Sequence, residues 1–210
     1  MKQQQYYDKY LNDCMLEAEV HEYFKREIQE AGYSGCTFRR SFNSVELTVR
    51  VAEPELVWGP NHERIHQLEA VLAQRMNVRL ENVTIFCDKI LARGLSADIL
   101  ADQLKQRIEK QTPVRQAAMY VIKSALRARA KGCEVRVAGK LRQNRANVQK
   151  YREGVIISAG KPGKDFINKA IRHIPLKKGI IGIQVKVFDE YKKNQFGKVM
   201  VLPDKVEIAE

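Results

Sequence analysis

Residues 45–76, VELTVRVAEPELVWGPNHERIHQLEAVLAQRM, decide how the first part of this chain folds. Residues 45–51 alternate hydrophobic with polar side chains, which is the period of a strand with one buried face. From residue 65 onward the spacing changes to three or four, the period of an amphipathic helix: Ile65, Leu68, Leu72 and Met76. The stretch therefore predicts a strand, a glycine-led loop and a helix, the loop being Gly59, Pro60, Asn61 and His62.

The segments on both sides extend this unit. Hydrophobic residues at helical spacing predict a helix over about residues 14–31, and Gly32 follows where a helix would end. A short strand is expected around residues 36–41, and residues 82–90, NVTIFCDKI, predict a closing strand. The first part of the chain is therefore predicted to be a small α+β unit.

This layout resembles a KH domain, in which a GxxG loop lets a nucleic-acid backbone approach peptide N–H groups. Here His62 stands in place of the second glycine, and Pro60 has no N–H to donate. We therefore expect a KH fold whose grip on single strands is weakened.

The same residues also fit the HExxH pattern, in which two histidines one helical turn apart hold zinc and the glutamate acts as the base. His62, Glu63 and His66 would supply these groups, and a zinc-dependent hydrolase is therefore an alternative reading. No third ligand stands out nearby, since His173 lies about a hundred residues away.

Positive charge is concentrated in the second half of the chain. Residues 1–90 hold 11 Lys and Arg against 14 Asp and Glu, a net of −3, whereas residues 91–210 hold 26 against 11, a net of +15. Such asymmetry predicts a polyanionic partner, and nucleic acid is favoured over a membrane because no basic amphipathic segment carries an aromatic stripe.

Other patterns narrow the class of protein. No hydrophobic run reaches about 18 residues, and the first residues lack the hydrophobic core of a secretory signal. The four cysteines are widely spaced without a CxxC pair, so neither a zinc knuckle nor a redox motif is expected. Reduced and mostly buried thiols in the cytosol are the expectation.

The second half is predicted to place two helices on an antiparallel sheet. Residues 95–108 and 114–126 show helical periodicity, and Thr112-Pro113 supplies a helix start. Strands are expected at residues 133–137, 155–158, 166–174 and 181–187, the last with Gln184 and Lys186 turned outward.

Residues 132–146 read GCEVRVAGKLRQNRA, and no carboxylate follows Glu134 until Glu153. Six cations fall between these two glutamates: Arg136, Lys140, Arg142, Arg145, Lys150 and Arg152. A one-sided stretch of this kind suits the phosphates of a folded RNA, which release counterions when cations bind them.

Six short motifs, in this order and spacing, resemble the eukaryotic form of the universal small-subunit ribosomal protein three family. They are GYSG at 32–35, GPNH at 59–62, ARGL at 92–95, AKGCEV at 130–135, GKLR at 139–142 and AIRHIPLKKGIIGIQVKV at 170–187. The resemblance covers about residues 14–188. It implies a type II KH domain (αββααβ) and a second α+β domain with two helices on a four-stranded, mostly antiparallel sheet.

The expected domains are residues 1–92 for the N-terminal helix and KH domain, 93–190 for the ribosomal domain and 191–210 for a C-terminal tail. The resemblance also implies a place at the head of the small subunit, beside the entrance for messenger RNA. Lys140, Arg142 and Arg145 match the basic stretch of the family, and Lys150 and Arg152 are expected RNA contacts by continuity. Arg115 matches the first of the family's basic residues at the start of the fourth helix, although Gln116 replaces the second.

The expected function is structural, in translation. The expected partners are small-subunit ribosomal RNA, messenger RNA near its entrance and neighbouring ribosomal proteins, in the cytoplasm and away from membranes. No catalytic centre, metal or cofactor is expected. A free KH-type regulator of messenger RNA, acting outside ribosomal particles, is a second alternative.

Overall fold

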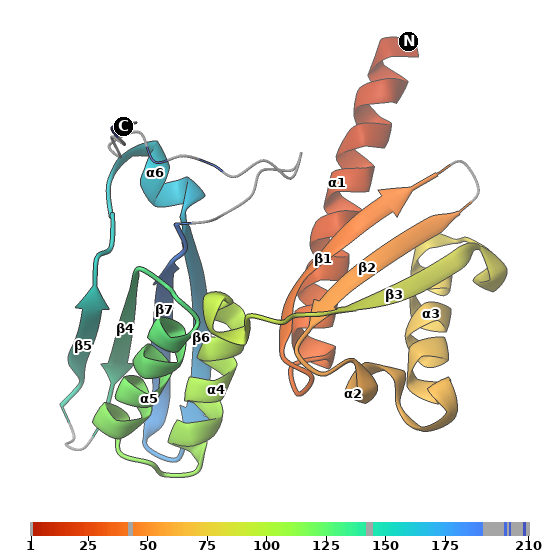
Figure 1. Ribbon diagram of the computed structural model, residues 1–210. Coiled ribbons are helices and arrows are strands. Elements are labelled where there is room, and N and C mark those ends of the chain that lie inside the picture. Colours follow the sequence, from red (N-terminus) through yellow and green to blue (C-terminus); the bar gives the residue numbers. More distant parts are fainter. Residues whose placement is uncertain are drawn as a thin grey trace. The chain divides into compact units, whose positions relative to one another are not determined.

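The computed structural model describes residues 2–41, 44–141 and 145–190, together with the single positions 200, 202 and 208. The chain divides into two compact units, Met1–Leu91 and Ala92–Glu210, each with its own sheet and helices (Figure 1). Of the predicted tail, residues 191–210, only positions 200, 202 and 208 are among the described residues. No helix in the described part of the chain is long and apolar enough to cross a membrane.

The first unit has the element order αββααβ, interrupted by two short 3-10 turns. Its elements are α1 (Lys2–Glu27), β1 (Tyr33–Arg40), β2 (Val45–Val51), α2 (Pro54–Trp58), η1 (Pro60–His62), α3 (Glu63–Met76), η2 (Leu80–Asn82) and β3 (Val83–Lys89). The sheet has the order β1-β2-β3, with β1 antiparallel and β3 parallel to the central strand. This order confirms the predicted KH fold.

The alternation in β2 explains the core of this unit. Val45, Leu47, Val49 and Val51 are at most 1% exposed, whereas the residues between them are more exposed. They pack in one cluster with Val20 and Phe24 of α1, with Ile28 directly after that helix, and with Leu68, Leu72 and Met76 of α3. Full burial of side chains of this size contributes about 1.5–3 kcal/mol each, so the hydrophobic pattern fixes which face of β2 points inward.

Helix α1 begins at Lys2 rather than near residue 14, and it ends at Glu27 rather than residue 31. The early start was missed because the helix carries no buried stripe there: Tyr7, Tyr10 and Met15 are all more than 60% exposed. Residues 28–32 form turns, and Gly32 has a φ of 70°, as expected of a glycine just beyond a helix end.

The second unit places two helices on a four-stranded antiparallel sheet. Its elements are η3 (Arg93–Leu95), α4 (Ala97–Glu109), α5 (Val114–Arg127), β4 (Gly132–Gly139), β5 (Asn147–Gly154), α6 (Gly160–Asp165), β6 (Ile167–Leu176) and β7 (Gly179–Phe188). The strand order is β5-β4-β7-β6, and every neighbouring pair is antiparallel. Helices α4 and α5 lie on the same face of this sheet (Figure 1).

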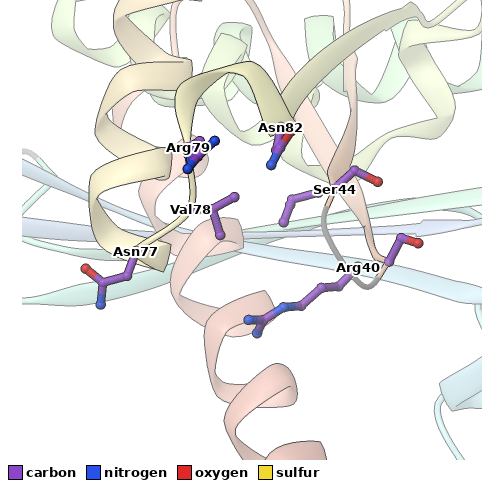
Figure 2. A pocket seen from close by; sticks show the side chains of 8 residues that line it. Arg40, Ser44, Asn77, Val78, Arg79 and Asn82 are labelled. Atoms are coloured by element: carbon purple, nitrogen blue, oxygen red, sulfur yellow. The ribbon is translucent and has the colours of Figure 1, made fainter.

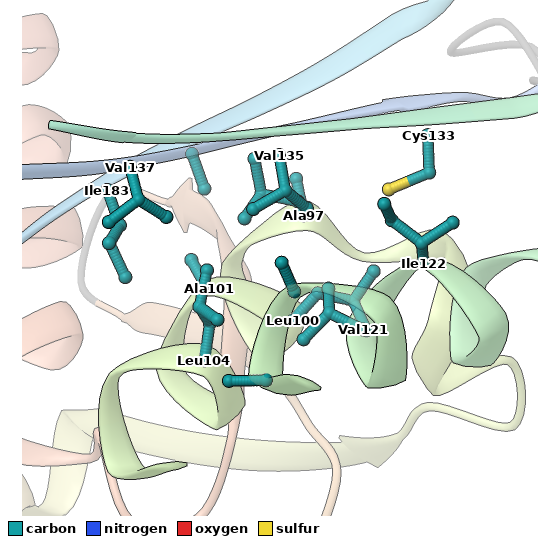
Figure 3. Packing of buried hydrophobic residues seen from close by; sticks show 14 of the residues in the cluster. Ala97, Leu100, Ala101, Leu104, Val121, Ile122, Cys133, Val135, Val137 and Ile183 are labelled. Carbon is teal, nitrogen blue, oxygen red and sulfur yellow. The ribbon is translucent and has the colours of Figure 1, made fainter. Parts of the chain in front are cut away.

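Figure 3 shows how this unit is packed. Leu100 and Leu104 of α4 and Val121 and Ile122 of α5 meet a layer of strand residues that includes Val135, and all are at most 1% exposed. The predicted fold class, an α+β chain with a KH domain and a second helix-and-sheet domain, is confirmed.

One predicted strand was placed wrongly. Residues 155–158 have no regular secondary structure, and the fourth strand of the sheet is β5, Asn147–Gly154. Because β5 lies at the edge and is exposed along most of its length, it lacks the hydrophobic alternation that marks a strand in a sequence. Short helix α6 was not predicted either.

A buried ion pair joins α4 to β6. Arg172, 8% exposed, donates hydrogen bonds from Nε and Nη2 to the two carboxylate oxygens of Asp102, at 2.8 and 3.2 Å. Its Nη2 also lies 3.0 Å from a carboxylate oxygen of Asp98. Burial by itself lowers the pKa of the Arg172 guanidinium, but the hydrogen bonds and charges of Asp102 and Asp98 outweigh burial and raise this pKa above its ordinary value.

Candidate nucleic-acid interface

The β4–β5 hairpin carries most of the basic stretch singled out in the sequence. Cys133, Val135 and Val137 of β4 point into the core, so the alternate residues of β4 point to the opposite, open face of the sheet. The register pairs Arg136 with Lys150, and it pairs Glu134 with Arg152. Since paired residues share a face, these four polar side chains lie together on the open face.

Glu134 lies at the centre of this group and is only 6% exposed. Its Oε2 is 3.2 Å from Nζ of Lys150 on β5, and its Oε1 is 3.7 Å from Nζ of Lys186 on β7. One carboxylate therefore holds a lysine from the strand on either side. Lys150, predicted as an RNA contact, has this ion pair in the free chain and keeps a side chain that is 56% exposed.

Arg152 is held by the backbone beyond its own strand. Its Nη2 donates a hydrogen bond of 3.1 Å to the carbonyl oxygen of Ile156. A guanidinium has five N–H donors, so this bond orients the side chain and leaves most donors for another partner.

The hairpin tip brings two more of the predicted residues together. Lys140 follows β4 directly, Arg145 lies two residues before β5, and both are exposed. Arg142, the third predicted contact at the tip, lies outside the described residues.

Arg115 lies in the first turn of α5 and is exposed. Helix α5 packs on β4 and connects to it through a short turn, so the two run in opposite directions. The start of α5 therefore lies at the same end of the unit as the end of β4 and the hairpin tip. The turn between β6 and β7, with Lys177 and Lys178, reaches the same end because Ala138 of β4 pairs with Gly182 of β7.

Lys169 of β6 was not predicted to be a site residue, and Lys186 was predicted only to point outward. The register pairs Lys169 with Lys186, which in turn pairs with Glu134, so both lysines share the open face with the hairpin cations. The alternation within β6, where Ala170, Arg172 and Ile174 are buried, is the signal that would have placed Lys169 outward.

The GPNH loop of the first unit contains three residues with a positive φ. Gly59 has a φ of 67°, Asn61 of 51° and His62 of 62°. Glycine adopts such angles readily, whereas a histidine there has the unfavourable Cβ contact that disfavours left-handed backbone. The ring of His62 lies 5.9 Å from that of Trp58, centroid to centroid, so side chains occupy the space around a loop that is bare in a GxxG sequence.

Arg64 supports this loop from beneath. It donates hydrogen bonds of 3.2 Å to the carbonyl oxygens of Leu56 in α2 and Glu27 at the end of α1. Carbonyls in the last turn of a helix have no partner within the helix, so one guanidinium stabilises two helix ends. A Cβ at Gly59 would lie 2.9 Å from Cβ of Arg64, so this close approach requires glycine.

The HExxH reading requires both histidines on one helical face. Helix α3 begins at Glu63, and His62 precedes it with left-handed backbone angles. Nδ1 of His66 lies 3.1 Å from a carboxylate oxygen of Glu69. In the part of the chain that the structure describes, no group of three or more His, Cys, Asp and Glu is placed to hold a metal ion.

A polar hollow of about 500 Å³ lies in the first unit, between the β1–β2 turn and the segment after α3 (Figure 2). It is lined by Arg40, Ser41, Ser44, Val45, Asn77, Val78, Arg79 and Asn82. Nη1 of Arg40 lies 2.6 Å from a carboxylate oxygen of Asp13, so an internal carboxylate already matches one of the two arginine charges. The hollow therefore has less uncompensated positive charge to attract an anion than the open face of the second unit has.

Comparison with known proteins agrees with this two-part organisation. Residues 104–187 match the family described as ribosomal protein S3, C-terminal domain, and residues 19–94 match the KH domain family. The chain is 39% identical over 202 residues to small ribosomal subunit protein uS3 of Candida albicans, a match that covers 96% of this chain and 80% of the relative. The protein of the same name from Dictyostelium discoideum is 37% identical over 206 residues, covering 96% and 94%. That from Saccharomyces cerevisiae is 35% identical over 202 residues, covering 96% and 84%.

Proposed function

Because this chain belongs to the family of small ribosomal subunit protein uS3, we propose that its β4–β5 hairpin binds ribosomal RNA in the head of the small subunit. Membership gives the chain a structural role in that subunit, and RNA binding and translation follow from the family. The ribosomal RNA contact, the messenger RNA contact and a cytoplasmic location are the finer parts of the proposal. In this proposal the chain binds RNA phosphates and helps to shape the entrance for messenger RNA, without a catalytic centre.

One observation carries the proposal: the hairpin presents exposed cations, while Glu134, the carboxylate on the same face of its strands, is buried. Lys140 and Arg145 are exposed at the tip, and Arg136 is exposed on β4, whereas Glu134 is 6% exposed. Such a surface attracts phosphates and positions the protein without reading base sequence. The slightly acidic KH unit then contributes mainly shape and contacts with neighbouring proteins.

Replacing Lys140 and Arg145 together by Glu tests the ribosomal RNA contact. We expect lower incorporation of the tagged variant into small subunits on sedimentation, and a shallower salt dependence of binding to small-subunit RNA. The matched control is Arg39→Glu with Arg50→Glu, which reverses two exposed cations on the open face of the KH sheet. Equal incorporation of the hairpin variant and the wild-type chain would refute the hairpin contact.

The messenger RNA contact rests on Arg115. A cation in the first turn of a helix is disfavoured by the helix dipole by about 0.3–1 kcal/mol, so an external anion would compensate for its position. We propose that Arg115 faces messenger RNA near its entrance. Arg115→Ala should reduce crosslinking of incoming messenger RNA to the assembled subunit while incorporation stays normal, and unchanged crosslinking would remove Arg115 from the channel.

A free KH-type regulator of messenger RNA is the rival function. It would require the GPNH loop to grip single strands, yet Pro60 has no N–H and His62 places a ring beside Trp58. A regulator would sediment outside ribosomal particles and would prefer particular bases, so sedimentation of the tagged chain separates the two functions.

A further inference from the structure

The open face of the second sheet is a single basic surface that spans all four strands. The register aligns Lys169, Lys186, Glu134 and Arg152 in one row across the sheet. The next row contains Ile171, Gln184, Arg136 and Lys150. Neighbouring strands are about 4.8 Å apart, so five cations from four strands lie within a small area.

The charge that this face shows to solvent is positive. At the outward positions of the four strands, Glu134 is the one carboxylate among the described residues, and it is 6% exposed beneath Lys150 and Lys186. Glu134 therefore offsets repulsion between lysines on two strands, while their ammonium groups stay at the surface. It is a positioning residue for these two cations.

Among the described residues, the face offers a single exposed ring, His173, on which an unpaired base could stack. Proteins that hold single strands stack bases on aromatic side chains. At the outward positions described here, the aromatic rings are Phe188, which is 1% exposed and packs edge-on against Phe166 with ring centroids 6.4 Å apart, and His173 of β6, which is exposed. Ala138 and Gly182 pair on the two central strands, between Val148 of β5 and His173 of β6.

We propose that this open face, Lys169 and Lys186 included, binds the sugar-phosphate backbone of double-helical RNA. Five cations with one exposed ring among them suit a duplex, whose bases are paired and whose phosphates remain accessible, better than a single strand. This inference rests on the proposed function in that the ligand is RNA. The inference differs from the proposed hairpin contact in two ways. It assigns the contact to the whole sheet face, including β6 and β7 outside the basic stretch, and it specifies a duplex.

The test uses the full chain and an RNA duplex of about 20 base pairs, long enough to exceed one dsRNA-binding site. Lys169→Gln with Lys186→Gln removes two cations of the face without placing a new carboxylate beside Glu134. The matched control, Lys123→Gln with Arg127→Gln, removes two exposed cations from α5, on the opposite side of the same unit. Thermal unfolding shows whether each variant is folded. If the double variant does not fold, the single variant Lys169→Gln replaces it in the binding test.

Binding is measured across a salt series, because each lost phosphate contact lowers the slope of log K against log salt by about 0.9. We expect the open-face variant to lose about 2 units of slope and the α5 variant to keep the wild-type slope. Equal losses in both variants, or tighter binding to a single strand of the same length, would overturn the proposal. If the wild-type chain binds small-subunit RNA and only the hairpin-tip variant loses slope, this inference fails while the proposed function stands; if the wild-type chain does not bind that RNA, the proposed function fails as well.

Discussion

Arg172 on β6 and Asp102 on α4 form a two-point hydrogen-bonded ion pair, with Nε and Nη2 at 2.8 and 3.2 Å from the two carboxylate oxygens. Removing one partner leaves a charge buried without full compensation, which costs about 3–5 kcal/mol. We expect Asp102→Ala to lower the free energy of unfolding of the second unit towards that range, softened by Asp98. Denaturant unfolding measures the loss. The comparison is Glu22→Ala, which breaks an exposed pair with Arg26 and should cost far less; a similar small loss for Asp102→Ala would contradict the prediction.

The left-handed backbone at His62 predicts an unusual order of stability among variants substituted at this position. Its φ of 62° suits glycine, whereas a β-branched residue is a strong outlier at such angles. His62→Gly should therefore unfold at a temperature equal to or above that of the wild-type chain. His62→Val should be less stable than His62→Gly by about 1–2 kcal/mol. Thermal unfolding of the two variants checks this order, and a more stable valine variant would show that the loop has a different conformation.

Gly94 lies where the turn η3 approaches helix α5 closely, which predicts that a larger residue at this position destabilises the second unit. A Cβ at this position would lie 2.6 Å from the carbonyl oxygen of Ser124 and 2.7 Å from Cβ of Ala128. Since backbone cannot move aside easily, Gly94→Ala should destabilise the second unit by about 1–3 kcal/mol. Gly182→Ala is the control, because its nearest atom would be 4.0 Å away. Equal melting temperatures for the two variants would disprove the contact.

Cys133 should be the least reactive of the four thiols. Burial, and then the charge of Glu134, raise the pKa of the Cys133 thiol to about 12. A thiol-specific reagent at pH 8 should label the exposed Cys14 rapidly and Cys133 only on unfolding. Mass spectrometry of labelled peptides reads this out, and native labelling of Cys133 at the rate of Cys14 would contradict its burial.

The same shift sets a pH dependence of stability. The folded-state pKa lies above the unfolded value of about 8.5, so the neutral buried thiol contributes its full stabilisation below pH 8.5. That contribution falls as pH rises from about 8.5 towards 12, by on the order of 1 kcal/mol per pH unit. The stability advantage of the wild-type chain over Cys133→Ala should therefore shrink across pH 9–11.

Periodicity predicted the elements that have one buried face. Helix α5 runs from Val114 to Arg127, against a prediction of residues 114–126, and β2 runs over the predicted residues 45–51. In both, burial alternates with the period of the element, so the sequence carries the pattern. Strand β5 has no such face. The strand was instead predicted at residues 155–158, because residues 155–157 are hydrophobic.

The candidate interface was predicted in part for a similar reason. A run of cations without carboxylates is visible in a sequence, so the hairpin residues could be proposed from it. Lys169 lies far from that run, and its place beside Lys186 follows from the pairing of β6 with β7. The two ion pairs of Glu134, with Lys150 and Lys186, likewise depend on strand register, which a single sequence leaves undetermined.

Strand β5 forms one border of its sheet, so a row of its peptide groups points away from the domain. Such a border invites a second copy of the chain to add a strand and start a fibre. Lys150 and Arg152 place like charges along that border, and two copies brought together would repel each other. These cations would therefore disfavour pairing between free copies of the chain, and a high salt concentration would weaken this repulsion.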